Sequence, residues 1–332
     1  MNAYNVAVVG VTGMVGRVFL KVLEERKLPI DNIYFFASAR SKGTKIEFDG
    51  KEYEVEELTE SSFDRKIDVA LFSAGGATSK TFSPIAAKKG TVVVDNSSAW
   101  RMDPDVPLVV PEVNSQDIKL HKGIIANPNC STIQAVVALK PLHDAFRIKR
   151  IVYSTYQAVS GAGMAGYMDL KDGLLGAPPK KFPHPIAGNC IPHIDVFLDN
   201  GYTKEEMKMV EETRKILHEP ELRITATTVR VPVFNSHSES INIEFENEFD
   251  ISGVRKALEN AAGVVVCDDV ANNAYPLALD ASGKDEVFVG RIRRDESVES
   301  GLNIWVVADN IRKGAATNAV QIVEELIKWW NE

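Results

Sequence analysis

Apolar and polar residues alternate in blocks along the first 130 residues, a pattern that predicts buried strands separated by helices. Short apolar runs have the length of strands at 4–9, 32–37, 68–73, 91–95 and 123–126. A helix is expected after the first run, where apolar residues recur at positions 15, 18, 19, 22 and 23. Another is expected to end near Lys89, before Gly90. Strands that alternate with helices predict a parallel, doubly wound sheet.

The second half of the chain changes to strands in succession. Strands are predicted at 150–157, 222–231, 238–246, 264–267, 286–293 and 302–308, and helices at 204–218, near 254–261 and at 314–330. Thr203 is the expected cap of the first of these helices. Residues 176–193 are rich in Pro, Gly and Asn and predict a long irregular loop. This half is therefore expected to be a mostly antiparallel sheet with helices on one face.

Composition limits the classes of protein that this chain can be. A chain of 332 residues is expected to form two domains rather than one. Its content of 45% apolar and 25% charged residues is ordinary for a globular enzyme. A net charge of -8 without a sustained basic run argues against nucleic-acid binding. No apolar run approaches the roughly 20 residues that span a bilayer. The N-terminus lacks the basic region of a signal peptide, so a cytoplasmic location is expected.

The cysteines add one candidate for chemistry. Cys130, Cys190 and Cys267 are too widely spaced for a disulfide framework or a metal site, which fits a reducing compartment. Asn127-Pro128 breaks the strand before Cys130, and an amphipathic helix follows it, with Asn129 or Ser131 as its cap. A helix N-terminus favours thiolate over thiol, which would make Cys130 a nucleophile. The alternative is a small buried packing residue, as expected for the other two cysteines.

A glycine turn follows the first predicted strand. Gly10, Gly13 and Gly16 stand between that strand and the first helix, the context in which backbone can approach a dinucleotide pyrophosphate. The alternative is a glycine-rich turn without a ligand. The second strand ends in Ser38-Ala39-Arg40-Ser41, with no acidic residue for a ribose 2′-hydroxyl. A guanidinium there suits a 2′-phosphate, so NADP is favoured over NAD unless Arg40 is only a solvated surface residue.

Other charged residues allow two interpretations each. Arg101 follows the fourth strand, at the edge where ligands gather, and is a candidate anion binder. Glu212 and Lys215 lie three apart on one predicted helix, so without further information a surface salt bridge is the preferred interpretation. His237 is either a general acid/base or a plain exposed histidine.

Six motifs together resemble aspartate-β-semialdehyde dehydrogenase over essentially the whole chain. They are the N-terminal glycine turn, Asn129-Cys130, Gln157 with 160–163, 212–215, 230–238 and 309–316. The resemblance implies a Rossmann-type NADP-binding domain of residues 1–129 and 311–332, to which the last helix returns. It also implies an inserted α+β catalytic and dimerisation domain of residues 130–310, similar to that of glyceraldehyde-3-phosphate dehydrogenase. A homodimer is expected, or else a tetramer, with no metal.

The resemblance further implies the reversible conversion of aspartyl phosphate to aspartate semialdehyde, which leads to lysine and diaminopimelate, threonine, methionine and isoleucine. Cys130 beside Asn129 would form a thioester, His237 would be the acid/base and Gln157 would orient the substrate. Arg230 would hold the α-carboxylate, Glu212 the α-ammonium, and Arg101 and Lys215 the phosphate. The NADP contacts would be Gly10, Thr12, Gly13, Met14, Val15, Gly16, Arg40, Ser41, Ser160, Gly161 and Asn310.

Two other functions share part of this pattern. An N-acetyl-γ-glutamyl-phosphate reductase uses the same thioester chemistry, but its nucleophile is expected in a Gly-Cys-Tyr setting that Asn129-Cys130-Ser131 does not match. The Ser-Cys-Thr-Thr-Asn setting expected of a glyceraldehyde-phosphate dehydrogenase is also absent. A non-catalytic NADP-sensing protein would have no reason to retain Cys130, Gln157, Arg230 and His237 together.

Overall fold

The computed structural model describes residues 3–332, so that residues 1 and 2 of the expected first domain lie outside the described residues. The chain forms two compact units. Unit 1 consists of the chain up to Asn129 together with Ala315–Glu332, and unit 2 is Cys130–Gly314. The chain thus returns from unit 2 to unit 1 between residues 314 and 315, four residues after the boundary expected between 310 and 311. No helix among the described residues has the length and apolar character needed to cross a membrane.

Unit 1 is built on a six-stranded sheet in which all neighbouring strands run parallel, as predicted. Its strand order is β5-β2-β1-β6-β7-β8. The strands are β1 (Tyr4–Val9), β2 (Ile30–Ala37), β5 (Glu56–Glu57), β6 (Val69–Phe72), β7 (Val92–Asp95) and β8 (Ile124–Ala126). The central strands are buried throughout, which explains why they appear in the sequence as continuous apolar runs.

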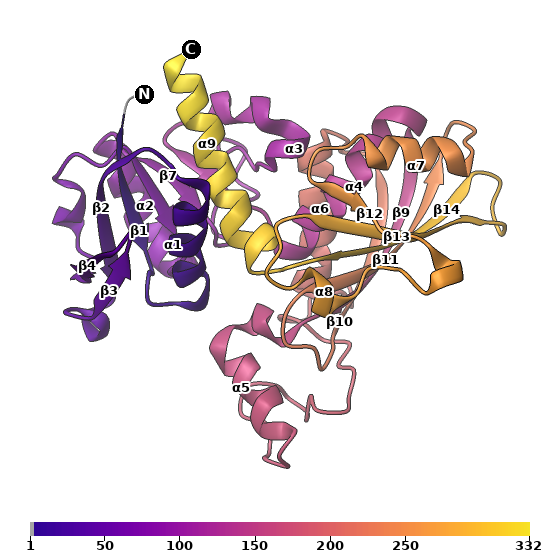
Figure 1. Ribbon diagram of the computed structural model, residues 1–332, viewed down its shortest axis with the longest axis horizontal. Coiled ribbons are helices and arrows are strands. Elements are labelled where there is room, and N and C mark those ends of the chain that lie inside the picture. The colour runs from indigo at the N-terminus through magenta and orange to yellow at the C-terminus, as the bar shows by residue number, and fades with distance from the viewer. Residues whose placement is uncertain (1–2) are drawn as a thin grey trace. The chain divides into compact units, whose positions relative to one another are not determined.

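Helices cover both faces of this sheet. On one face α1 (Met14–Arg26) packs beside α9 (Asn318–Asn331), the last helix of the chain (Figure 1). Their apolar sides, with Phe19 of α1 and Val323 of α9, share a core with Leu71 and Val94 of the sheet. α2 (Gly76–Lys88) packs on β7 and β8. The short helix α3 (Pro111–Asn114) contacts α9.

The order of the strands creates a switch point at the carboxyl end of β1. From β1 the chain goes to β2 on one side of the sheet and later to β6 on the other, and open α/β sheets bind ligands at such a point. Gly10 leaves β1 there with φ +84°, and a Cβ on it would lie 2.4 Å from the carbonyl oxygen of Ser73, just after β6. Both the backbone conformation and the close approach therefore require glycine.

A hairpin of unit 1 is absent from the predicted elements. It consists of β3 (Lys45–Phe48) and β4 (Lys51–Glu54), paired antiparallel. Phe48 and Tyr53 of the hairpin make edge contacts with Phe35 of β2. Its strands are short and rich in charge, so the apolar pattern that marks the other strands is weak here.

Unit 2 contains a six-stranded mixed sheet in the order β10-β9-β11-β14-β13-β12. Its strands are β9 (Ile148–Gln157), β10 (Arg223–Arg230), β11 (His237–Phe245), β12 (Val264–Val266), β13 (Val287–Asp295) and β14 (Gly301–Ala308). The three central pairings are antiparallel, whereas β10 on β9 and β12 on β13 are parallel. The expectation of a mostly antiparallel sheet thus holds for its centre and not for its edges.

Three helices of unit 2 pack together and against this sheet. They are α4 (Cys130–Phe146), α6 (Lys204–Leu217) and α7 (Ile251–Glu259). Thr203 caps α6 as predicted: its hydroxyl accepts the N–H of Glu206, and the Glu206 carboxylate accepts the N–H of Thr203 at 2.7 Å. The short helix α8 (Ala278–Ala281) contacts β14.

The segment between β9 and α6 forms an excursion with a small core of its own. Its helix α5 (Gly163–Gly173), which the sequence analysis did not predict, stands apart from the sheet (Figure 1). Residues 176–193 are irregular, as expected. One carboxylate, Asp169, accepts the backbone N–H groups of three successive residues of this loop, Lys180, Lys181 and Phe182, so a side chain replaces the hydrogen bonds of regular structure.

Substitution of Gly16 tests the close packing at the start of α1. A Cβ at this position would lie 2.2 Å from the carbonyl oxygen of Gly10, which belongs to the backbone and cannot rotate away. Gly16→Ala should therefore lower the free energy of unfolding by about 1–3 kcal/mol, measured by urea denaturation. Gly76→Ala is the matched control, because its nearest neighbouring atom is 3.9 Å away. Equal midpoints for the two variants would contradict this packing.

Candidate active site

Two residues that are distant in the sequence meet in unit 2. Cys130 is the first residue of α4, and its Sγ lies 3.2 Å from Nε2 of His237, the first residue of β11. The N-terminal end of a helix favours the thiolate form of a cysteine placed there. An imidazole nitrogen in contact with such a sulfur makes the pair a candidate nucleophile with its proton partner. The interpretation of His237 as an exposed histidine is wrong, because the residue is 0% exposed, whereas Cys130 is half-buried.

The turn before β11 sets the position of His237. Ser236 has φ +72°, a conformation that few residues other than glycine adopt, and its N–H donates to Oδ1 of Asn310 at 2.9 Å. Asn310 is also joined to Ser160, whose hydroxyl accepts from Nδ2 at 3.0 Å. These three buried polar residues therefore hold the strained turn from which the imidazole projects.

The His237 ring is fully buried and has a second fixed neighbour. The backbone N–H of Ala158 donates to its Nδ1 at 3.0 Å. Burial, followed by the positive charge of Arg230, lowers the pKa of His237 to about 3. The imidazole is consequently neutral over the working pH range of most enzymes.

Arg230 and Gln157 end neighbouring strands. The parallel register of β10 on β9 pairs them directly, so their side chains are delivered to the same edge of the sheet. NH1 of Arg230 donates to the carbonyl oxygen of Ala158 at 2.6 Å, while its Nε has no hydrogen-bond partner among the described residues. Burial lowers the pKa of Arg230. A buried guanidinium with an unused N–H is suited to an incoming carboxylate.

Glu205 is a site residue that the sequence analysis missed. Its carboxylate accepts Nε2 of Gln157 at 3.1 Å and Nζ of Lys208 at 2.9 Å, and its charge acts on Arg230 and His237. Spacing could have revealed it, because buried residues recur on this face of α6 at positions 205, 209, 212 and 216. A carboxylate on the apolar face of a helix indicates a partner inside the fold.

Glu212 lies on this same face of α6 and is only 1% exposed. The interpretation of Glu212 and Lys215 as a surface salt bridge is therefore wrong for Glu212. Lys215 is half-buried. The α6 helix packs against β10 and α4, the elements that carry Arg230 and Cys130.

Two glycines make room around Cys130, Arg230 and His237. A Cβ on Gly161 would lie 2.9 Å from NH1 of Arg230 and 3.3 Å from Cε1 of His237. A Cβ on Gly314 would lie 2.9 Å from Cβ of Cys130. Gly314 belongs to a single π-helical stretch, Arg312–Thr317, just before α9, and such stretches are frequent at functional sites. Gly161, predicted as a cofactor contact, thus lies against Arg230 and His237.

The predicted pyrophosphate turn lies in unit 1, at the switch point of the parallel sheet. Gly13 is exposed and stands at the N-cap of α1, whose first residues are Met14 and Val15. No side chain caps this helix, and its first turn contains no acidic residue. The positive end of the helix is therefore not neutralised locally and suits a phosphate.

Arg40 lies where a 2′-phosphate would be expected. It is exposed in the turn Ala39–Ser41 that follows β2, and Ser41 is joined to Thr12 of the glycine turn by a contact of 3.4 Å between their hydroxyl oxygens. The structure thus brings together the two sequence segments proposed to recognise the nucleotide.

Arg101 and Asn129 are buried in unit 1. Nε of Arg101 donates to the carbonyl oxygen of Asn127 at 2.9 Å, and NH2 donates to that of Asn96 at 3.0 Å. These carbonyl groups follow β8 and β7, so the guanidinium is fixed at the carboxyl edge of the sheet. Asn129 is the last residue of this segment and directly precedes the nucleophile.

The remaining cysteines differ from each other. Cys190 is exposed, so its interpretation as a packing residue is wrong, whereas Cys267 is half-buried. The described cysteines are all free thiols. Residues 3–332 contain no group of three or more His, Cys, Asp or Glu side chains that could hold a metal ion.

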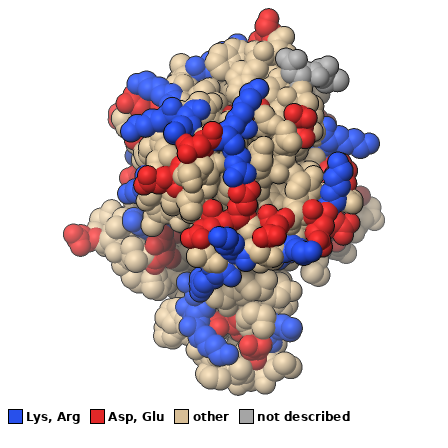
Figure 2. Space-filling model, turned by 90° about the vertical axis from the view of Figure 1, so that its left-hand side faces the viewer, with Lys and Arg blue, Asp and Glu red and all other residues tan. Residues whose placement is uncertain are grey.

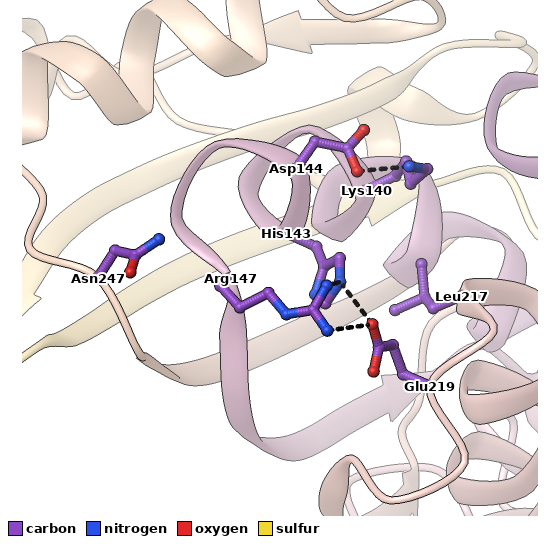
Figure 3. A pocket seen from close by; sticks show the side chains of 7 residues that line it. All are labelled: Lys140, His143, Asp144, Arg147, Leu217, Glu219 and Asn247. Atoms are coloured by element: carbon purple, nitrogen blue, oxygen red, sulfur yellow. Dashed lines mark hydrogen bonds and ion pairs between the residues drawn. The ribbon is translucent and has the colours of Figure 1, made fainter.

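A separate hollow of about 360 Å³ opens at the other end of α4 (Figure 3). It is lined by Lys140, His143, Asp144, Arg147, Leu217, Glu219 and Asn247. Its charges are paired internally, because Glu219 contacts both His143 and Arg147 while Asp144 contacts Lys140. α4 has 17 residues, so this hollow lies roughly 20 Å along the helix from Cys130 and is not the site of the cysteine chemistry.

The surface shown in Figure 2 mixes the two signs of charge. Lysine and arginine side chains lie beside aspartate and glutamate side chains over this face. The view shows no continuous basic area of the kind that tracks a phosphate backbone.

Comparison with known families extends over both units. Residues 5–121 match the family described as semialdehyde dehydrogenase, NAD binding domain. Residues 139–313 match semialdehyde dehydrogenase, dimerisation domain. Together these matches cover most of the chain.

Individual relatives are similar over their full length. Aspartate-semialdehyde dehydrogenase of Aquifex aeolicus (strain VF5) is 60% identical over 334 residues, which cover 98% of this chain and 98% of the relative. Aspartate semialdehyde dehydrogenase II from Vibrio cholerae, solved as a complex with ASA, is 49% identical, with a TM-score of 0.94 and coverage of 99% of each chain. The Candida albicans enzyme, solved with NADP, is 26% identical, with a TM-score of 0.78 and coverage of 98% of each chain.

One buried acid near the site has no evident partner for its charge. Glu239 lies two residues after His237 on β11 and is fully buried, and neither of its carboxylate oxygens has a hydrogen-bond partner among the described residues. Burial raises the pKa of Glu239 well above 4.5. The side chain is therefore protonated in the folded protein at pH values where the unfolded chain is ionised.

Replacing Glu239 with Gln should change how stability depends on pH. A raised folded-state pKa means that the stability contributed by Glu239 is complete below pH 4.5 and is lost as pH rises through the folded-state pKa. From pH 5 to pH 8 the wild type should lose stability relative to Glu239→Gln, by about 1.4 kcal/mol per pH unit until the folded-state pKa is reached. Urea denaturation at both pH values measures this difference. Glu211→Gln, at an exposed position, should show no such trend, and a parallel trend in both variants would contradict the assignment.

Proposed function

The chain belongs to the aspartate-semialdehyde dehydrogenase family and is an oxidoreductase of amino-acid biosynthesis with that activity; we propose that it works through a thioester on Cys130 with NADPH as the reductant. The substrate is L-aspartyl 4-phosphate and the product is L-aspartate 4-semialdehyde. The observation that carries this mechanism is the 3.2 Å contact between Sγ of Cys130 and Nε2 of His237. The product leads to lysine, diaminopimelate, threonine, methionine and isoleucine.

Cys130 is the proposed nucleophile. Its sulfur attacks the acyl carbon of aspartyl phosphate, a C–S bond forms, and the bond to the phosphate oxygen breaks, which leaves a thioester. The nicotinamide cofactor, when bound, supplies the hydride that reduces this thioester. When the C–S bond then breaks, the aldehyde is released and Cys130 returns as the thiolate. His237 acts through Nε2 as the acid/base partner of the oxygen on the reacting carbon.

The charged groups around the cysteine match the three ionic groups of the substrate. Arg230 holds the α-carboxylate, because it is buried and its Nε is unused. Glu212, buried on α6, takes the α-ammonium. Gln157 orients the substrate, and its own position is set by Glu205 and Thr155, which bond the two ends of its amide. Vibrio cholerae aspartate semialdehyde dehydrogenase II was solved with ASA, and we assign that ligand, as aspartate semialdehyde, to the corresponding groups here.

Phosphate is assigned to two cations. Arg101 is fixed at the carboxyl edge of the parallel sheet by the carbonyl groups of Asn96 and Asn127. Lys215 lies on α6, three residues after Glu212. A guanidinium and an ammonium neutralise the charge of the leaving phosphate, which makes it a better leaving group. Asn129 places the nucleophile immediately after this edge.

The residues of unit 1 fit a dinucleotide. Gly10 and Gly16 bring backbone together in a turn that a Cβ would fill, and Gly13 leaves the start of α1 without a side chain. Met14, Val15 and Thr12 complete this turn. Arg40 with Ser41 selects the 2′-phosphate of NADP, and the Candida albicans enzyme of similar fold was solved with NADP. Ser160, Gly161 and Asn310 in unit 2 are the remaining proposed cofactor contacts.

We further place the partner subunit of a homodimer on the sheet of unit 2, within the matched dimerisation domain. Val152 and Tyr156 alternate along β9 with buried residues, and the Tyr156 ring, 38% exposed, packs on Trp305 of β14. These residues lie on the face opposite Tyr153 and Gln157, and an exposed aromatic face of this kind is suited to a second copy. The cytoplasm is the proposed location, because the mechanism requires Cys130 as a reduced thiol.

The proposed reaction can be tested in the direction that forms NADPH. Aspartate semialdehyde and NADP should give a steady rise in absorbance at the nicotinamide band that depends on added phosphate, because phosphate releases the acyl group from the cysteine. Cys130→Ala should reduce kcat at least about a thousandfold, since it removes the nucleophile. Cys190→Ala, at the exposed cysteine, serves as the control and should retain full activity. Sustained turnover by Cys130→Ala would overturn the mechanism.

Cofactor selection depends on Arg40. Arg40→Ala should raise the KM for NADP roughly ten- to a hundredfold, because one charge-assisted contact to the 2′-phosphate is lost. The kcat with NADP and the kinetics with NAD should change little. Lys42→Ala removes a neighbouring exposed cation that pairs with Glu57 at 4.0 Å and should have little effect. If the wild type uses NAD and NADP equally well, the role given to Arg40 is wrong.

A further inference from the structure

We propose that the backbone N–H of Ala158 is a positioning group that fixes His237 in a single neutral tautomer, with its proton on Nε2. The ring then offers Cys130 and the substrate a hydrogen-bond donor and never a base. This inference rests on the proposed function and revises one part of it, because hydrogen-bond donation from Nε2 replaces proton transfer by His237.

The tautomer follows from the direction of one hydrogen bond. A backbone N–H can only donate, so Nδ1 of His237, 3.0 Å from the nitrogen of Ala158, must carry the lone pair. The single proton of a neutral imidazole then resides on Nε2. The opposite tautomer would place two N–H groups against each other at a ring that is 0% exposed.

A second proton on the ring is disfavoured by the surroundings. Cε1 of His237 and NH1 of Arg230 are both so close to Gly161 that a Cβ there would contact each of them, at 3.3 Å and 2.9 Å. The guanidinium therefore shares one side of the imidazole and repels an imidazolium. The charged groups that act on the ring are Arg230 on β10 and Glu205 on α6, and the thiol of Cys130 on α4 contacts Nε2. Glu239 lies two residues further along β11 and is fully buried.

The consequence for catalysis concerns the oxygen on the reacting carbon. As the hydride pair forms the new C–H bond, the carbonyl pair moves onto oxygen, and Nε2–H donates a hydrogen bond to the resulting oxyanion. When the pair returns to form C=O, the C–S bond breaks and the sulfur leaves as a thiolate that accepts the same N–H at 3.2 Å. The proton stays on Nε2 throughout, and the cysteine owes its ionised form to the helix end rather than to the histidine.

The chain permits removal of this one N–H. Ala158 has φ -62° and ψ 150°, which are values that proline adopts, and the preceding Gln157 ends an extended strand. The carbonyl oxygen of Ala158, which accepts from Gly161 and Arg230, remains available in proline. Ala158→Pro thus deletes the donor to Nδ1 with little change to the backbone, but its Cδ takes the place of the amide hydrogen and also pushes the His237 ring away from its position 3.0 Å from the nitrogen. Ala158→Gly keeps the donor as a control.

The direct test is ¹⁵N NMR of the wild-type protein labelled at histidine. His237 is one of six histidines, and its signals are assigned by their loss in His237→Gln. We expect Nδ1 of the unprotonated type and Nε2 of the protonated type, unchanged from pH 8 to pH 5.5. A proton on Nδ1, or on both nitrogens at pH 6, would overturn the inference whatever the activity of the protein.

The variants give a second, kinetic test. Ala158→Pro should lower kcat about a hundredfold with a smaller change in KM, and its His237 signals should show mixed tautomers. Ala158→Gly should keep the wild-type tautomer and most of kcat. Wild-type kcat should show no acid limb from His237 between pH 5.5 and pH 8. Unchanged kcat in a folded Ala158→Pro protein overturns the inference, whereas failure of the wild type to turn over aspartate semialdehyde overturns the proposed function and leaves the NMR result standing.

Discussion

The contact between Cys130 and His237 is the constraint on which the other features of unit 2 near the site depend. It joins the first residue of a helix to the first residue of a strand, and 107 positions separate them. Each of the surrounding features fixes the position of one of these two side chains. The Ser236 turn with φ +72° aims the imidazole, Gly314 lets the chain pass Cys130, and Ala158 fixes the far side of the ring. The low dielectric that makes these contacts strong also lowers the pKa of His237.

The sequence predicts those features that depend on local pattern. The parallel sheet of unit 1 was visible because its strands are buried on both faces and appear as apolar runs, and the cap at Thr203 because its partner Glu206 is three residues away. Cys130 and Gly10 were found for the same reason, since each marks the junction of one strand with one helix. The substrate came only from the resemblance to a known family.

The features that the sequence did not reveal depend on residues far apart in the chain. The spacing of buried residues on α6 can mark Glu205 as an acid that faces the interior, but only the packing of α6 shows that its partner is Gln157. The α5 helix is tied to the loop that follows it by its own carboxylate, Asp169, which accepts backbone N–H groups of residues 180–182, and not by a strong apolar stripe. The parallel edges of the second sheet are likewise set by crossovers that no short window of sequence contains.

Unit 1 is formed by two separate segments of the chain, so it cannot finish folding until the last residues have been synthesised. α9 supplies Val320, Val323 and Leu326 to the core around Phe19, and the ribosome makes these residues only after all of unit 2. Unit 2 is continuous and can complete its fold while the sheet of unit 1 still lacks one of its covering helices. During that interval the nascent protein exposes an apolar sheet face, so a chain that stops before α9 would be treated by chaperones and proteases as an unfinished nucleotide-binding domain.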